Sequence, residues 1–281
     1  MPSELAGVVV LYHPDDKVLD NILSYLPWLR QLVVVDNSSY LSPTLKRFFL
    51  DTEKILYRGD GINHGMAWAL NLGANMALES GCGWLLTMDQ DSRFEAGALD
   101  TMLAFPKDQQ RIGILSPSHV LTGKPCGGSG TVPSKVSCVM TSGNLLSLEA
   151  YKTAGPFLEK LFIDYVDYEY CLRLGKFRYQ VWVLPEAHLY HSLGELDSHK
   201  FLGITFNPTN HSPERRYYMA RNRLYVMSTY PSFAVGESWA WTKEIAKLFF
   251  FEKGRFLKIL YTGKGVWDFI RNRYGSLRRR K

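Results

Sequence analysis

Residues 84–92 join an apolar run to a pair of acids, reading Trp84-Leu85-Leu86-Thr87-Met88-Asp89-Gln90-Asp91-Ser92. The run is short and apolar, which indicates a buried strand rather than a helix. Asp89 and Asp91 alternate along an extended chain, so both can point to the same side of the strand end. Carboxylates placed so closely repel each other unless a cation neutralises them, and Mg²⁺ prefers such oxygen ligands. The alternative is a solvated junction between a strand and a turn.

The residues before this run predict alternating strands and helices. Residues 7–12 and 32–35 are β-branched runs, typical of parallel strands that are covered on both faces. We expect a helix from about residue 13 to 29, a short strand over 55–57 and a helix that starts near residue 63. Together they predict a nucleotide-binding α/β half. The Gly-x-Gly-x-x-Gly of dinucleotide dehydrogenases and the Gly-Lys-Ser/Thr of P-loop proteins are both missing from it.

Polar residues at the strand and helix ends of this half are candidates for nucleotide contact. Asp36 ends the second strand, where an acid often meets a ribose hydroxyl or a base edge, although a plain turn residue fits as well. Residues 63–74 carry small residues on one helical face, with Asn63 as a possible cap and Asn71 two turns further on. Tight packing of a helix on a sheet is the alternative explanation.

The following residues predict further α/β structure. We expect a helix over 94–105, a strand over 112–116, a loop rich in Gly, Ser and Pro over 117–132, a strand over 136–140 and a helix over 149–154. Asn144 lies in the polar segment after the second of these strands. It can meet a sugar or an acceptor there, or belong to a turn.

A second acidic group contains Asp164, Asp167 and Glu169, mixed with aromatic residues. Three acids within one and a half turns are unusual for a core helix. Asp167 falls at or near a helix start, where the helix dipole favours its negative charge, and a partly buried carboxylate there can act as a general base. The alternative is N-capping by Asp164 or Asp167, with Glu169 in solvent.

Two further features suggest ligands for a metal ion or a diphosphate. His191 follows the strand expected over 179–184 and can complete a metal or diphosphate site, although a structural histidine is equally consistent with the sequence. Residues 214–228 predict a helix with four arginines, among them Arg221. A guanidinium there can hold a diphosphate by paired hydrogen bonds, or the helix can be a salt-bridged surface helix.

The basic excess of the chain is concentrated at its end. Residues 243–281 hold 12 Lys/Arg against 3 acids, a net charge of +9, whereas the other residues hold 21 Lys/Arg against 24 acids, a net charge of −3. Large aromatic and aliphatic residues interleave with these cations, which predicts a basic amphipathic helix at a membrane interface. A helix packed on the body, or on a second copy in a homodimer, is the alternative. No nucleic-acid recognition module appears, so we expect no nucleic-acid partner.

Composition excludes several other classes of protein. The four cysteines show no paired spacing for zinc, which indicates reduced thiols in a cytosolic protein. We expect no secretory signal in residues 1–7 and no membrane-spanning helix, because the best apolar segment, near 225–241, contains Pro231, Gly236 and Glu237.

With Asp36, residues 63–73, Asp89-x-Asp91 and Asp167 in this order, the chain resembles the family-two inverting glycosyltransferases with a GT-A fold. The resemblance covers about residues 7–225. Within that family it looks most like bacterial rhamnosyltransferases of O-antigen, lipopolysaccharide and cell-wall polysaccharide assembly, which use dTDP-L-rhamnose. This closer likeness is carried by Arg221-Asn222, Phe162-Ile163-Asp164-Tyr165-Val166-Asp167 and Leu11-Tyr12-His13-Pro14-Asp15.

The resemblance implies an α/β fold with a Rossmann-like nucleotide-binding domain and a mostly parallel central sheet, to which the pattern of the tail adds a helical, basic, amphipathic C-terminal extension. It implies a GT-A domain over residues 1–228, divided into a nucleotide-binding half (about 1–105) and an acceptor half (about 106–228). The basic amphipathic pattern of the tail predicts a membrane-associating extension over 229–281. The implied location is the cytoplasm, peripheral on the inner face of a bacterial plasma membrane.

The resemblance also implies roles for individual residues. Asp36 would contact the base, while Tyr12, Asn63, Gly65 and Asn71 would flank the nucleotide. Asp89 and Asp91 would bind the ribose and a Mg²⁺ or Mn²⁺ ion on the diphosphate. To these we add, from the residue chemistry above, His191 as a further metal ligand and Arg221 on the nucleotide sugar. Asp167 would be the catalytic base. The polar residues Asn144, Asp164 and Glu169 are our own candidates for the acceptor side. The usual Glu-Asp-x-Asp of the family reads Val166-Asp167-Tyr168-Glu169 here, so its first acid is missing.

These assignments require the two acidic groups to converge on one cleft. The expected reaction moves L-rhamnose from dTDP-β-L-rhamnose to a hydroxyl of a lipid-linked oligosaccharide or polysaccharide. Another donor, an N-acetylhexosamine or galactofuranose nucleotide, remains open. So does a non-catalytic membrane-peripheral subunit that binds nucleotide sugars, because of the altered acidic motif.

Overall fold

The computed structural model describes residues 4–106, 111–121, 124–126, 131–191, 199–201, 204–206 and 211–277. The chain divides into two compact units. Unit 1 comprises Met1–Leu158 and Tyr170–Ser192, and unit 2 comprises Glu159–Glu169 and Leu193–Lys281. The boundaries between these two units do not fall at residue 228. The division into a transferase domain and an extension at that residue stays a prediction.

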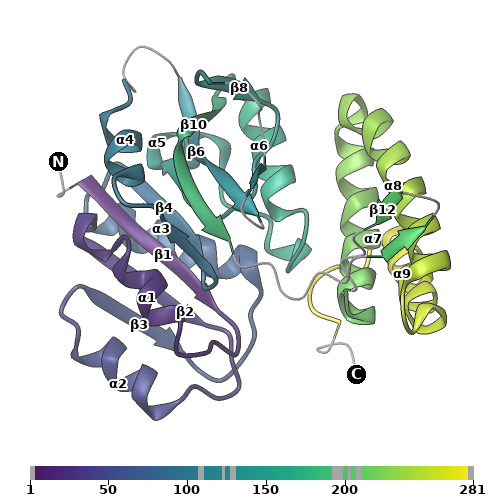
Figure 1. The fold of residues 1–281 in the computed structure, drawn as a ribbon, viewed down its shortest axis with the longest axis horizontal. Coiled ribbons are helices and arrows are strands. Elements are labelled where there is room, and N and C mark those ends of the chain that lie inside the picture. Colours follow the sequence, from purple (N-terminus) through teal and green to yellow (C-terminus); the bar gives the residue numbers. More distant parts are fainter. Residues whose placement is uncertain are drawn as a thin grey trace. The chain divides into compact units, whose positions relative to one another are not determined.

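Unit 1 is built on one mixed sheet with the strand order β3-β2-β1-β4-β9-β6-β10-β5 (Figure 1). One half is parallel and holds β1 (Leu5–Leu11), β2 (Gln31–Asp36), β3 (Ile55–Gly59) and β4 (Trp84–Asp89). β9 (Asn144–Ser147) runs antiparallel to both β4 and β6 (Ile112–Leu121), and β6 is parallel to β10 (Gln180–His191). β5 (Ser92–Phe94), β7 (Lys124–Cys126) and β8 (Ser134–Val136) pair antiparallel at the margins. The predicted α/β fold with a mostly parallel central sheet is confirmed.

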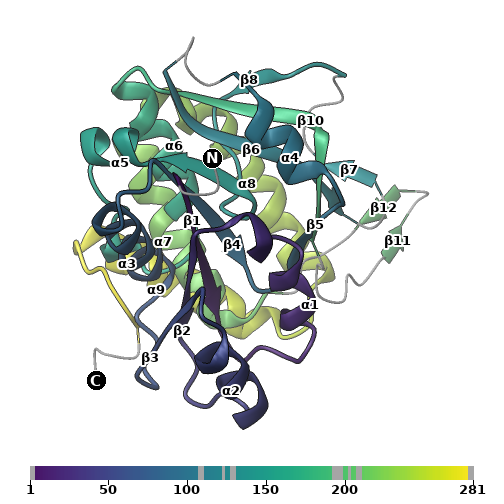
Figure 2. The ribbon, with the colours of Figure 1, turned by 90° about the vertical axis from the view of Figure 1, so that its left-hand side faces the viewer.

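The β-branched runs become the centre of this sheet because both faces are covered. Every residue of β1 is buried, and so are Leu32 to Asp36 in β2. α3 (Met66–Glu79) packs on β1 and β4, and α5 (Leu148–Ala154) packs on β9 and β6 (Figure 2). α3 lies so close to β1 that a Cβ on Gly73 would come within 2.4 Å of Val8 Cβ. Tight packing of α3 on the sheet therefore requires glycine at position 73.

Several elements of unit 1 differ from the prediction. The expected helix over 13–29 is only α1 (Val18–Leu23), followed by a 3₁₀ turn (Leu26–Trp28), because Pro27 has no N–H to continue a helical ladder. The helix expected from residue 94 is α4 and begins at Ala98 (Ala98–Ala104). The helix α2 (Pro43–Asp51) was not predicted, although Ser42 caps it and Pro43 opens it, a recognisable start signal.

The second half of the sheet also departs from the expected strands. The strand expected over 136–140 is wrong, since β8 ends at Val136 and β9 begins only at Asn144. β10 continues to His191 instead of ending near Leu184, with a register shift between Leu184 and His188. Pro185 lies within that irregular stretch, where a residue without an N–H donor is tolerated.

Unit 2 contains three long helices: α7 (Pro213–Thr229), α8 (Pro231–Phe251) and α9 (Arg255–Ile270). It also holds a 3₁₀ turn (Glu159–Leu161) and a hairpin of β11 (His199–Phe201) and β12 (Ile204–Phe206). α9 packs closely along α7. A Cβ on Gly265 would lie only 2.4 Å from the carbonyl oxygen of Tyr217, so this approach requires glycine. α6 (Val166–Lys176) begins in unit 2. None of the helices in the described part of the chain has the length and apolar character needed to cross a bilayer.

Candidate active site

The carboxyl ends of three parallel strands carry the first group of candidate residues. The strand register pairs Leu11 with Asp36 and Val10 with Asp89, so Tyr12, Asp36 and Asp89 lie at one edge of the sheet. Ligands of open α/β sheets bind at this edge. The placement therefore agrees with the expectation for Asp36 and Asp89.

A histidine from the far end of the sheet joins the acid pair. β5 follows the acids and pairs antiparallel with β10, which places His191 opposite Ser92. Asp89, Asp91 and His191 each offer a ligand atom, and these atoms all lie within 4.8 Å of one another. His191 Nδ1 is 2.6 Å from Ser92 Oγ and 3.4 Å from Asp91 Oδ1.

The chemistry of this cluster fits a hard divalent cation. It offers carboxylate oxygens and one imidazole nitrogen, a donor set that suits Mg²⁺ or Mn²⁺. Asp91 Oδ1 is buried and accepts no hydrogen bond within the described part of the chain, although the Asp91 side chain as a whole is 43% exposed. A buried carboxylate oxygen without a donor is costly unless a cation or proton meets it.

Residues that the sequence analysis did not single out hold this cluster in place. Gln90 accepts from the backbone N–H of Tyr12 at 2.7 Å and donates to its carbonyl oxygen at 3.2 Å, which ties the end of β1 to the acidic turn. The backbone N–H of Asp89 donates to Ser142 Oγ at 3.1 Å, and His119 Nε2 lies 2.9 Å from the carbonyl oxygen of Ser142. Burial lowers the pKa of His119, so its ring is held neutral. The central position of Asp-Gln-Asp was the only sequence signal for Gln90.

Asp36 is fixed in a buried position at the end of β2. It is 4% exposed, and its carboxylate accepts from the backbone N–H of Ser38 at 2.9 Å and from Tyr57 Oη at 2.8 Å. Burial, and then the hydrogen bond to Asp36, raise the pKa of Tyr57, which keeps the phenol protonated as a donor. The Asp36 carboxylate is therefore held in one orientation at the carboxyl end of β2.

The turn before α3 is organised around Gly65 rather than capped by Asn63. Gly65 has φ +91° and begins the helix without a side-chain cap, and Asn63 Oδ1 accepts from its N–H at 2.9 Å. Asn37, another residue that the sequence analysis missed, accepts from the N–H of His64 and donates to the carbonyl oxygen of Gly65. This turn thus lies beside the end of β2, where Asn63 and Gly65 remain candidates for nucleotide contact.

Two of the predicted binding residues, Asn71 and Arg221, are buried and hydrogen-bonded within the protein. Asn71 is 5% exposed, and its amide bonds both the N–H and the carbonyl oxygen of Phe157 and accepts from Tyr151 Oη. Arg221 is fully buried, and its guanidinium donates to the carbonyl oxygens of Lys160, Leu161 and Gly275. These bonds use the polar groups of Asn71 and Arg221 within the protein, which disfavours a contact with the nucleotide sugar; that assignment stays a prediction.

Arg221 and Asn222 shape the loop that leads into α6. Asn222 Nδ2 donates to the carbonyl oxygens of Leu161, Ile163 and Asp164 at 2.7 to 2.9 Å. This loop contains consecutive non-glycine residues with positive φ, +60° at Asp164 and +63° at Tyr165. Such strain persists only where the surroundings impose it, and it is concentrated at functional sites.

The three acids of this segment differ in environment. Asp167 lies half-buried in the first turn of α6, where its Oδ1 accepts from the N–H of Tyr168 at 2.9 Å. Asp164 accepts from Arg215 Nε at 3.1 Å, and burial raises its pKa against the opposing effect of Arg215. Glu169 is 2% exposed and accepts from Tyr230 Oη at 2.8 Å. Glu169 thus has a buried partner inside unit 2, which disfavours a contact with the acceptor; that assignment stays a prediction.

Asn144 is buried opposite Thr87, donates to the carbonyl oxygen of Met140 at 2.6 Å, and leaves its Oδ1 without a hydrogen-bond partner within the described part of the chain.

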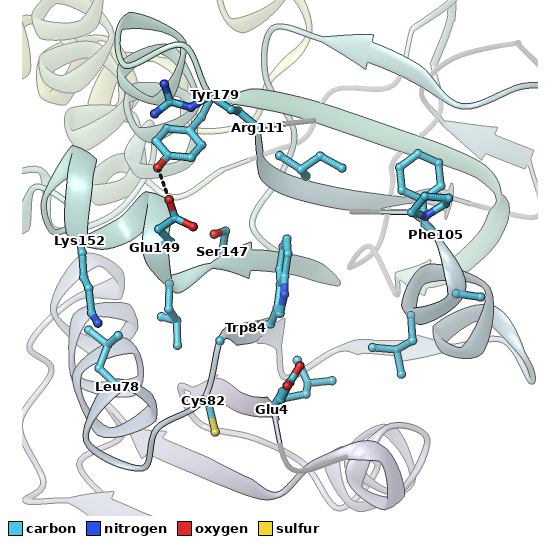
Figure 3. A pocket seen from close by; sticks show the side chains of 17 residues that line it. Glu4, Leu78, Cys82, Trp84, Phe105, Arg111, Ser147, Glu149, Lys152 and Tyr179 are labelled. Atoms are coloured by element: carbon cyan, nitrogen blue, oxygen red, sulfur yellow. Dashed lines mark hydrogen bonds between the residues drawn. The ribbon is translucent and has the colours of Figure 1, made fainter. Parts of the chain in front are cut away.

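A cavity of about 1050 Å³ lies at the start of β4, beside Trp84 and Cys82 (Figure 3). Glu149, which bonds Tyr179 Oη, and Lys152 are among its lining residues. The cavity lies at the opposite end of β4 from Asp89, so it is not the candidate site.

Comparison with known proteins decides the family. No family model matches the chain. A dTDP-rhamnosyl transferase, RfbF of Shigella flexneri, is 33% identical over 245 residues, which cover 81% of each chain. The chain belongs to the rhamnosyltransferase family. As a member it is a glycosyltransferase enzyme, and the resemblance found in its motifs is confirmed.

The fold of this rhamnosyltransferase-family chain also agrees with a solved glycosyltransferase structure. The structure of GalNAc-T7 with UDP, GalNAc and Mn²⁺ matches with a TM-score of 0.60 over 80% of the present chain, at 12% identity. The match covers 47% of that chain, so the present chain spans about half of its length. At this identity the likeness shows the fold, which is GT-A.

Proposed function

We propose that the chain transfers L-rhamnose from dTDP-β-L-rhamnose to a hydroxyl group of a growing saccharide, with inversion at the anomeric carbon. The observation that carries this proposal is the cluster of Asp89, Asp91 and His191 at the carboxyl edge of the sheet. The donor is inferred from the relative named a dTDP-rhamnosyl transferase.

The donor would bind across the carboxyl ends of β1, β2 and β4. Asp36 is fixed there by Tyr57 and Ser38, where it can accept from the base or the ribose. Tyr12, Asn63 and Gly65 would flank the nucleotide. Asp89, Asp91 and His191 would hold Mg²⁺ or Mn²⁺, which when bound neutralises the charge that builds up on the departing diphosphate.

The acceptor side requires a base, and Asp167 is our candidate. Its carboxylate would take the proton of the acceptor hydroxyl while the acceptor oxygen attacks the anomeric carbon. The bond between that carbon and the diphosphate oxygen breaks in the same step, and dTDP leaves. Inversion of a β-linked donor gives an α-L-rhamnoside. Asp164 and Asn144 stay as candidates for acceptor contact.

We further propose a lipid-linked oligosaccharide or polysaccharide as the acceptor, used at the inner face of the plasma membrane. The cationic and apolar end of the chain supports this location. A water-soluble donor and a lipid-linked acceptor meet only at such an interface.

A donor panel tests the proposal directly. Purified protein is incubated with dTDP-L-rhamnose, UDP-N-acetylglucosamine, UDP-N-acetylgalactosamine or UDP-galactofuranose, with Mg²⁺, with Mn²⁺ or with EDTA, and release of the nucleoside diphosphate is measured. We expect release from dTDP-L-rhamnose in the presence of a divalent ion and at least a tenfold loss, of order 1.4 kcal/mol or more, with EDTA. Preference for another donor would exclude rhamnose, and binding without turnover of any donor would point to the non-catalytic alternative.

A further inference from the structure

The two C-terminal helices carry their acids on the inside. Residues 231–277 contain only the acids Glu237, Glu244, Glu252 and Asp268, and all of them are buried or half-buried. Arg223 of α7 pairs with Glu237 at 2.9 Å and with Glu244 at 2.6 Å. The inner faces of α8 and α9 are therefore partly ionic.

The remaining acids of these helices pair in the same inward direction. Arg216 of α7 bonds both Glu244 and Glu252, and Lys258 Nζ lies 2.9 Å from Glu252. Tyr217 Oη donates to Asp268 at 2.7 Å. Buried charges persist only when they are paired in this way. The ionic inner face therefore holds α8 and α9 to α7 and fixes which side of each helix faces out.

The outward faces are apolar, which inverts the usual arrangement of a helix on a globular unit. Six apolar side chains on these helices are left in solvent, from 63% to 80% exposed: Val235, Trp239 and Phe250 on α8, and Phe256, Leu260 and Ile270 on α9. Single exposed apolar residues are common, but a concentration of this size marks an interaction surface. We call these six residues the apolar face.

Cations, and no acids, accompany the apolar face. Lys243, Lys247, Lys253, Arg255, Lys264 and Arg271 are all exposed on the same helices or at their ends. A second copy docked face to face would bring cations against cations, which disfavours a symmetric dimer. An anionic lipid surface accepts both the apolar side chains and the cations. Charge complementarity thus selects the bilayer among the occupants of this face.

We propose that the outward faces of α8 and α9 dock in the interface of an anionic lipid bilayer, with the apolar face in the acyl boundary and the lysines and arginines at the headgroups. The proposed binding is peripheral and reversible. The biological purpose of this docking rests on the proposed function, because docking would bring the enzyme to a lipid-linked acceptor. The binding itself requires neither donor nor metal.

Vesicle flotation of the full chain, without nucleotide sugar, tests the docking surface. We compare wild type with F256Q/L260Q, using phosphatidylcholine vesicles with and without phosphatidylglycerol. The control is Y40Q/L50Q, which removes two comparably exposed apolar residues, 68% and 63% exposed, from unit 1. We expect F256Q/L260Q to lower the partition coefficient at least about tenfold, since each side chain removes apolar area from the lipid. Y40Q/L50Q should bind like wild type.

Two outcomes overturn the docking proposal. One is equal flotation of F256Q/L260Q and wild type on anionic vesicles. The other is a wild-type dimer, seen by sedimentation, that F256Q/L260Q dissociates while wild type fails to bind vesicles, which would make the apolar face a contact between copies. Donor hydrolysis without vesicles is measured in parallel. Hydrolysis unchanged in F256Q/L260Q separates docking from catalysis, and vesicle binding without any hydrolysis would overturn the proposed function but not the docking surface.

Discussion

Replacing Asp91 by asparagine is expected to lower kcat/KM for rhamnosyl transfer by at least about a thousandfold, because the charge that holds the cation on the diphosphate is lost. The substitution keeps the size of the side chain. It leaves in place the hydrogen bond between Ser92 and His191, which ties β5 to β10. We therefore expect the unfolding temperature to change little, and the effect to appear as lost turnover of dTDP-L-rhamnose under steady-state conditions.

A matched control distinguishes the effect of changing the site from the effect of removing one negative charge elsewhere on the protein. Asp51 lies on α2, is 67% exposed and pairs with Arg47, one turn earlier on the same helix, at 3.3 Å. Asp51→Asn should therefore turn over donor like wild type, since an exposed ion pair contributes little. Wild-type turnover in Asp91→Asn would contradict the metal assignment, and equal losses in both variants would show a non-specific effect.

Replacing Asp167 by asparagine is the second substitution with a large expected effect. Loss of the general base should lower kcat for transfer by about 10² to 10⁴. Affinity for dTDP should stay at the wild-type value, because the amide keeps the shape of the side chain and the donor site is built from other residues. The measurement is transfer to an acceptor alongside dTDP binding by calorimetry, which separates kcat from donor affinity.

Substitutions of neighbouring acids show whether Asp167 or another carboxylate is the base. Asp164 has a raised pKa through burial, so it is the alternative proton acceptor in the same segment. If Asp164→Asn loses transfer while Asp167→Asn keeps it, the base is Asp164 and the assignment of Asp167 is wrong. Glu159→Gln, at an exposed acid of the same unit, serves as the control and should behave as wild type.

The sheet and its acidic edge were predictable from the sequence because their signals are local. The β-branched runs of β1 and β2 read as buried strands, and the strand ends place Asp36 and Asp89 at one edge. His191 could be named but not placed. It reaches Asp91 only through the antiparallel pairing of β5 with β10, a contact between segments about a hundred residues apart.

The roles of Arg221 and of the C-terminal helices were not predictable for a different reason. A helix rich in arginine has the same composition whether its guanidinium groups meet a diphosphate or buried carbonyl oxygens. Arg221 binds carbonyl oxygens of Lys160 and Leu161, about sixty residues earlier in the chain. Likewise, an amphipathic pattern defines two faces of a helix but not which of them turns inward. In α8 the ion pairs with Arg216 and Arg223 of α7 decide it.

The central claim is that Asp89, Asp91 and His191 bind a divalent cation together with the diphosphate of the donor. Titration of Mn²⁺ followed by electron paramagnetic resonance, with and without dTDP, tests it most directly. We expect wild type to bind one Mn²⁺ per chain more tightly when dTDP is present, and Asp91→Asn to lose this binding by at least about a hundredfold, of order 2.7 kcal/mol. Equal Mn²⁺ binding by the two proteins, or dTDP binding by wild type that is indifferent to the metal, would contradict the claim.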